Sequence, residues 1–176
     1  MRGTKWMRGL VGGAVALGVV LAGAAPARAQ DAAALGAELG PGAVAVIRGL
    51  DDIKETVHRT TVAMGGGVDR ATAAIARLDG EDRPVPAMIG AAEKGLGGVN
   101  LAGERGHQRV AWIVERTARV LSKVGAPAGA FEAIHAGGES AHQAIHERAE
   151  AACRAIGDAL ASALADEAPP AEAEGV

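Results

Sequence analysis

Four of the five histidines of this 176-residue chain follow a glutamate by three residues. Residues three apart on a helix are neighbours, so each pair would present a carboxylate oxygen and an imidazole nitrogen to the same point. Carboxylate and neutral imidazole are ligands of divalent metals, so the pattern predicts a candidate metal site. The pairs are Glu55 with His58, Glu104 with His107, Glu132 with His135, and Glu139 with His142.

Two of these pairs belong to a longer match between two segments that are 35 residues apart. Gly103-Glu104, His107-Gln108, Glu115 and Arg119 reappear as Gly138-Glu139, His142-Gln143, Glu150 and Arg154. The match predicts two related helices. On the second helix, His146 falls on the same stripe as His142 and Glu150, which makes it a further candidate ligand.

The Glu-x-x-His spacing resembles that of the ferritin-like di-metal carboxylate bundles, in which two helices each contribute this motif and two others each contribute a glutamate. The resemblance is confined to these short motifs. It implies a metal-binding or metal-sequestering bundle. Neutral imidazole and carboxylate ligands favour zinc, iron or copper as the metal. The candidate ligands are Glu104, His107, Glu139, His142 and His146. A metal-dependent oxidase would need an open coordination position as well.

The same residues are compatible with two simpler roles. The helix macrodipole favours glutamate in a first turn, and both Glu104 and Glu139 follow a glycine that can end a loop. A histidine one turn later gains an anionic neighbour, and such a surface pair stabilises a helix by about 0.2–0.5 kcal/mol. The pairs are therefore also typical of a solvated surface, or of a surface that responds to pH through histidine protonation.

The remaining reactive residues predict no catalytic site. Ser140 and His142 would point in different directions on a helix, and the sequence contains no Gly-x-Ser-x-Gly turn. The single Cys153 has no internal disulfide partner, and His146 is two helical turns away from it, too far for a nucleophile–base pair. We therefore expect a non-catalytic binding or structural module, with metal binding as the alternative.

The N-terminus has the pattern of a secretory signal peptide. Three basic residues precede an uncharged stretch over residues 10–25, and Ala27-Arg28-Ala29 provides small side chains that predict cleavage before Gln30. The uncharged stretch is shorter than the roughly 20 residues of a spanning helix. We therefore expect a secreted or periplasmic protein without a transmembrane span.

Removing residues 1–29 would leave an acidic chain. The leader contains four of the 18 basic residues and no acidic one, so 14 basic side chains remain against 21 acidic ones, a net charge of −7. The mature chain has only Trp112 and Phe131 as aromatic residues. The mature chain therefore lacks the overall basic charge and the aromatic stacking residues of a nucleic-acid-binding protein, and this composition argues against that class. The expected partner is a second copy of the chain or an envelope protein.

Composition and periodicity predict an all-α fold, a small alanine-rich bundle of about four helices over residues 30–166, followed by a disordered acidic tail over 167–176. The first helix is expected to begin at Pro41 and to end at Gly65-Gly66-Gly67. The other expected segments are a short helix over 69–78, a loop over 79–86, at most a frayed turn or two over 87–103, and helices over 104–124 and 131–166. The last two of these helices have opposite net charges, which predicts that they form an antiparallel hairpin around Pro127.

Overall fold

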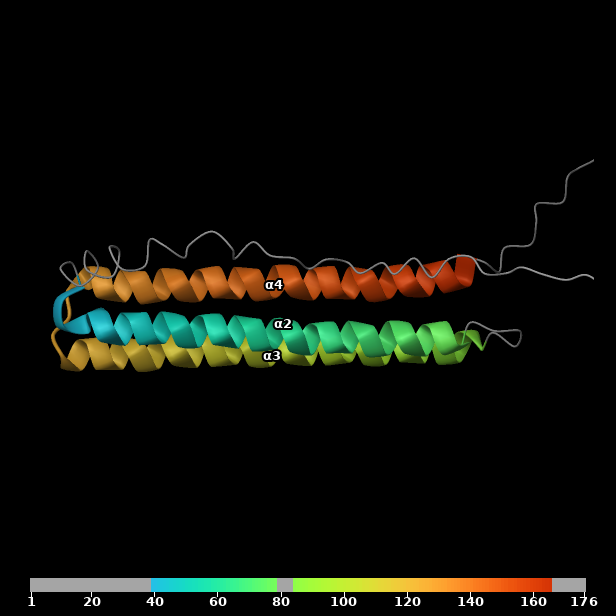
Figure 1. Cartoon of the computed structure of the whole chain (residues 1–176), viewed down its shortest axis with the longest axis horizontal. Coiled ribbons are helices and arrows are strands. Elements are labelled where there is room, and N and C mark those ends of the chain that lie inside the picture. The colour runs from blue at the N-terminus through green and yellow to red at the C-terminus, as the bar shows by residue number, and fades with distance from the viewer. Residues whose placement is uncertain (1–38, 79–83, 166–176) are drawn as a thin grey trace, which may run out of the picture.

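The computed structural model describes residues 39–78 and 84–165. A short 3-10 turn, η1 (Gly40–Gly42), leads into three long helices, α2 (Ala43–Leu78), α3 (Val85–Lys123) and α4 (Ala128–Ala165) (Figure 1). These described ranges contain no strand. The prediction of an all-α bundle is confirmed, but the predicted number of about four helices is wrong, since three helices fill these ranges.

The three helices lie side by side, and each contacts the other two (Figure 1). Successive helices run in opposite directions, so the start of α2, the end of α3 and the start of α4 lie at the same end of the bundle. The antiparallel hairpin predicted around Pro127 is therefore present. The predicted signal peptide (1–29) and acidic tail (167–176) lie outside the described residues.

The core positions of every helix recur at intervals of eleven residues. Eleven residues over three turns correspond to about 3.67 residues per turn, close to the 3.6 of a straight α-helix. A stripe with this period stays almost parallel to the helix axis, so the helices remain in contact along about 55 Å without a left-handed supercoil. The buried columns are Gly42 of η1 with Ile53, Met64 and Ile75 of α2; Met88, Val99, Val110 and Leu121 in α3; and Ala130, Ala141, Ala152 and Ala163 in α4.

Three layers of the core repeat one arrangement, in which a contact between small residues of α2 and α3 is covered by an isoleucine of α4. In the first layer, a Cβ added to Gly49 would come 2.7 Å from Oγ1 of Thr117 and 2.8 Å from Cδ1 of Ile134. The backbones of α2 and α3 therefore approach closely because one partner lacks a side chain. The layers are Gly49, Thr117 and Ile134; Thr60, Gly106 and Ile145; and Ala71, Gly95 and Ile156.

The glycine clusters do not interrupt the helices, contrary to the prediction. α2 continues through Gly65-Gly66-Gly67, and α3 includes residues 87–103, which were expected to form at most a frayed turn or two. Each interior glycine lowers helix propensity by roughly 1 kcal/mol relative to alanine. Burial of the neighbouring core side chains, such as Met88 and Val99, offsets this penalty.

The α3–α4 connection is set by a glycine with a left-handed backbone. Gly125 has φ 65° and follows the last turn of α3. The N–H of Gly125 donates to the carbonyl of Ser122, and the N–H of Ala126 donates to that of Leu121. This pattern is a Schellman motif, which satisfies the final carbonyls of α3 and turns the chain toward α4.

Candidate functional site

His107 of α3 and His142 of α4 face each other across the interface between the two helices. Their Nδ1 atoms are 2.6 Å apart, their ring centroids are 4.9 Å apart, and the ring planes are inclined by 17°. At this distance one Nδ1–H donates to the other Nδ1, which accepts through its lone pair. Both side chains are half-buried at the edge of the core.

The 35-residue match and the antiparallel order of α3 and α4 allow equivalent residues to meet at one level of the bundle, and the relative shift of the two helices places His107 and His142 at that level. Two copies of a motif on antiparallel helices are related by a local two-fold axis, and equivalent residues meet only where the axis passes. His107 and His142 are equivalent in the two copies, so the axis passes between them. Glu104 and Glu139, which precede them, are displaced in opposite directions along the bundle.

The other three candidate ligands make separate contacts or none. Glu104 accepts a hydrogen bond from Nε2 of Gln108 at 3.2 Å, and His146 lies 3.1 Å from Glu150 through Nε2. Glu139 is exposed on α4. The structure therefore joins two of the five candidate ligands directly. Within residues 39–78 and 84–165, no three His, Cys, Asp or Glu side chains converge in a way that could hold a metal ion.

The environment of His107 favours its neutral form. Burial lowers the pKa of His107 below its usual value of 6.5, and the neighbouring His142 and His146 lower this pKa further. An imidazolium at position 107 would lose solvation and would face two further groups that can become positive. The hydrogen bond between the two Nδ1 atoms also requires that at least one of them is unprotonated.

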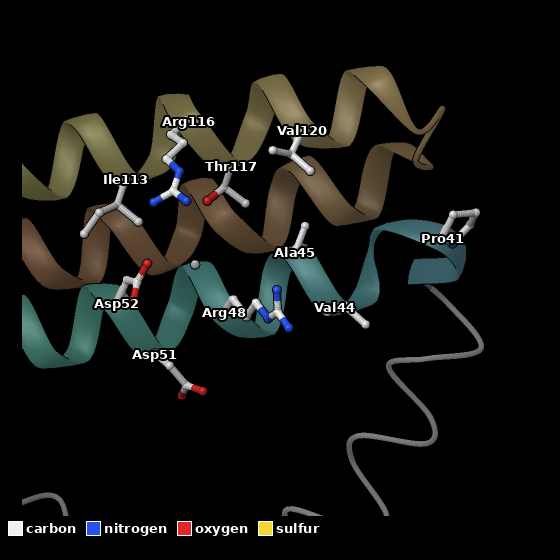
Figure 2. Close-up of a pocket in the computed structure, with 11 residues that line it drawn as sticks. Pro41, Val44, Ala45, Arg48, Asp51, Asp52, Ile113, Arg116, Thr117 and Val120 are labelled. Atoms are coloured by element: carbon white, nitrogen blue, oxygen red, sulfur yellow. The ribbon is translucent and has the colours of Figure 1, made fainter.

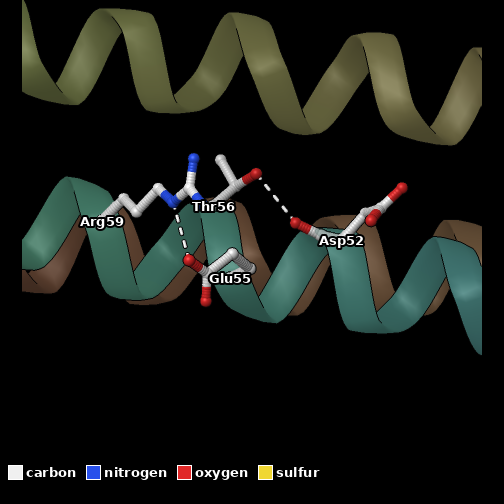
Figure 3. Close-up of polar contacts among 4 residues, drawn as sticks. All are labelled: Asp52, Glu55, Thr56 and Arg59. Carbon is white, nitrogen blue, oxygen red and sulfur yellow. Dashed lines mark hydrogen bonds and ion pairs between the residues drawn. The ribbon is translucent and has the colours of Figure 1, made fainter.

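The glutamate preceding His58 is engaged elsewhere. Glu55 accepts a hydrogen bond from Nε of Arg59 at 2.6 Å, and Thr56 donates to the carbonyl of Asp52 at 2.8 Å (Figure 3). His58 itself is exposed. Glu132 and His135 are exposed on α4. These two pairs have the surroundings of solvated surface residues.

A second candidate site, which the Glu-x-x-His motifs do not indicate, is a stripe of cations around Trp112 on the outside of α3. The guanidinium carbon of Arg109 lies 4.2 Å from the Trp112 ring centroid and that of Arg116 lies 5.2 Å from it. We call this stripe the cation–aromatic face; it comprises Arg105, Arg109, Trp112, Arg116, Arg119 and Lys123, all exposed. At 100° per residue these six side chains fall within a sector of about 80°.

Two hollows adjoin the cation–aromatic face. One, of about 250 Å³, is lined by Trp112, Arg116, Arg119, Val120 and Lys123. The other, of about 440 Å³, lies between α2 and α3, and Figure 2 shows Arg116 extending from α3 across it toward α2. Asp51 and Asp52 line the α2 side and reduce the positive charge at that edge.

The sequence contained a signal for this face. Residues 101–131 have five basic and two acidic side chains, and the basic ones recur at three-, four- and seven-residue steps. The net negative charge of the chain does not reveal this local concentration of basic residues.

No known protein family, curated protein or solved structure matches this chain.

Proposed function

We propose that the protein is an exported, non-catalytic binding module that binds its partner through the cation–aromatic face of α3. The observation that carries this proposal is the placement of Trp112, whose ring lies beside the guanidinium groups of Arg109 and Arg116 on the outside of a long helix. Trp112 is 41% exposed. Tryptophan and arginine are the residue types most enriched where interfaces derive their binding energy.

The chemistry of this face suits binding better than catalysis. Arginine remains protonated at any physiological pH and tryptophan has no acid–base function, so these side chains can attract and orient an anionic group but do not exchange protons with it. The N-terminal sequence supports export to the periplasm or the cell exterior.

Site-specific crosslinking in the native cell tests the binding function. A photoreactive residue replaces Trp112 in one variant and the exposed Gln143 of α4 in a matched control. We expect products between the protein and another molecule at position 112 and none at position 143. Equal yields at both positions, or no product at position 112, would contradict the proposal. Mass spectrometry of the same material tests export, which predicts a chain beginning at Gln30.

Metal binding is the second candidate function, and the approach of two imidazole nitrogens favours it. Zinc–imidazole bonds are about 2.0–2.1 Å long, so tetrahedral coordination by both Nδ1 atoms would place them about 3.3 Å apart. His107 and His142 would therefore have to separate by about 0.7 Å from their present 2.6 Å. His146, Glu104 or Glu139 would have to supply further ligands. Zinc, iron and copper fit this donor set.

A measurement of bound zinc tests this second function. Protein dialysed against zinc and then against buffer is expected to retain one ion per chain, and the His107→Ala/His142→Ala variant is expected to retain none. His58→Ala/His135→Ala is the matched control, because both of these histidines are exposed. Retention of zinc by the first variant, or its absence from the parent protein, would reject the metal site.

A further inference from the structure

We propose that the partner of the cation–aromatic face is the surface of an anionic lipid bilayer, an inference that rests on the binding function proposed above. Five cationic side chains lie along the outside of α3 over residues 105–123, a distance of about 27 Å. Among the described residues, Arg119 is the one cation of this face that has an ion-pair partner, Glu115 at 2.9 Å. The face therefore presents positive charge to solvent although the mature chain as a whole is acidic.

Exposed apolar side chains accompany the cations on the same ridge. Leu101 and Val120 are both exposed, and at 100° per residue they lie within about 80° of Trp112 around the helix. This combination of exposed side chains suits a bilayer interface, where apolar side chains enter the acyl boundary and arginines contact phosphates. Tryptophan, like tyrosine, is enriched at that interface.

The shape of the face also favours a lipid surface over a peptide. α3 forms a long, straight ridge at this point (Figure 1), and the adjoining hollows are partly open to solvent. A bilayer can contact the whole length of such a ridge at once, whereas an extended peptide requires a groove or a sheet edge. No helix among the described residues is long and apolar enough to cross a membrane, so the contact proposed here is with the bilayer surface.

An acidic segment of a second copy is the competing occupant. Residues 166–176 contain Asp166, Glu167, Glu172 and Glu174 and no basic residue. The test must therefore distinguish binding to lipid from self-association of the chain.

Co-sedimentation with vesicles makes this distinction. The full-length chain is mixed with vesicles of phosphatidylcholine containing a quarter phosphatidylglycerol, or of phosphatidylcholine alone. The first variant is Arg105→Gln/Arg109→Gln, which neutralises two exposed cations that line neither hollow. The matched control is Arg70→Gln/Arg77→Gln, two exposed cations of α2 near the other end of the bundle. All three proteins have the same N-terminal residues, so a difference in vesicle binding between them arises from the substituted arginines and not from the N-terminus.

Each cation close to an anionic bilayer raises affinity about fivefold. We expect the parent chain to prefer the anionic vesicles, the Arg105→Gln/Arg109→Gln variant to bind them about 30-fold more weakly, and the α2 control to bind within twofold of the parent. In a Trp6→Phe background, Trp112 emission should shift to shorter wavelength on the anionic vesicles. Circular dichroism of each variant verifies that the helices are retained.

Equal binding of all three proteins to the anionic vesicles, or equal binding of the parent to both vesicle types, would overturn the lipid proposal. Self-association in analytical ultracentrifugation that the α3 variant abolishes, without vesicle binding, would overturn it in favour of a second copy. In that case position 112 would still form crosslinks, so the binding function would stand. Failure of the binding function itself is recognised separately, by the absence of crosslinks at position 112.

Discussion

Gly106 of α3 lies directly against Thr60 of α2 in the middle layer of the core. A Cβ added to Gly106 would come 2.6 Å from Oγ1 and 2.7 Å from Cγ2 of Thr60, and 3.2 Å from Cδ1 of Ile145. The atoms of Thr60 are close to the α2 backbone and have little freedom to move away. The approach of α2 to α3 therefore depends on the absence of a side chain at position 106.

Gly106→Ala is accordingly expected to destabilise the protein by about 1–3 kcal/mol, the usual effect of an extra methyl group in a packed core. Urea denaturation followed by circular dichroism at 222 nm gives the free energy of unfolding. The added alanine improves helix propensity by about 1 kcal/mol, so any net loss of stability reports the steric conflict. An unchanged or raised stability would show that α2 and α3 are not in close contact at this layer.

Gly98→Ala is expected to have the opposite effect. Gly98 is an exposed residue of the same helix, and an added Cβ would meet no atom within 4 Å. The substitution gains helix propensity without a steric penalty, so the free energy of unfolding should rise by about 0.5–1 kcal/mol. The two variants form a matched pair of the same chemical change. A loss of stability in Gly98→Ala would indicate that α3 is not a continuous helix through its glycine-rich half.

This difference between glycines explains which part of the fold could be predicted from the sequence. Helical periodicity and high alanine content identified the helical class, and the opposite charges of the last two predicted helices identified the hairpin around Pro127. Propensity treated Gly95 and Gly98 alike as helix breakers, although Gly95 is buried beside Ala71 and Ile156 whereas Gly98 meets no atom of another helix. The helix boundaries could therefore be predicted only from the eleven-residue spacing of the core positions in all three helices, and not from the helix propensity of single residues.

The candidate site was predicted in part for a related reason. The repeat and the Glu-x-x-His spacing identified His107 and His142, which lie on the local two-fold axis and meet. The glutamates could not be placed, because the position of that axis depends on how far α3 and α4 are shifted along each other. The spacing of cations around Trp112 was visible in the sequence, but which side of α3 faces solvent depends on all three helices.

Gly125→Ala is expected to weaken the connection between α3 and α4. Gly125 has φ 65°, a left-handed backbone that raises the energy of any residue with a Cβ by about 1–2 kcal/mol, although an added Cβ would meet no neighbouring atom. The free energy of unfolding should therefore fall by about 1 kcal/mol. Gly125→Asn should restore part of this loss, because asparagine tolerates the left-handed region. Equal stability of the alanine and glycine proteins would argue against the Schellman motif.

The stability of the bundle should decrease as the pH falls below the usual pKa of histidine. Burial, followed by the nearby His142 and His146, lowers the pKa of His107 below 6.5 in the folded state. The unfolded chain therefore binds a proton at position 107 more readily than the folded chain does. Above pH 6.5 both states are neutral at this position and its contribution is complete; as the pH falls from there toward the lowered pKa, protonation of the unfolded state progressively reduces the free energy of unfolding.

Urea denaturation between about pH 7.5 and about pH 5 measures this dependence, with the His107→Ala variant as the comparison. His107→Ala should be less stable at the higher pH, because it lacks the hydrogen bond with His142, but should lose less stability on acidification than the parent protein. His135→Ala, which removes an exposed histidine of α4, should retain the dependence of the parent. If His107→Ala and the parent lose the same stability over this range, the acid sensitivity arises elsewhere in the chain, and the contact of His107 with His142 across α3 and α4 does not control it.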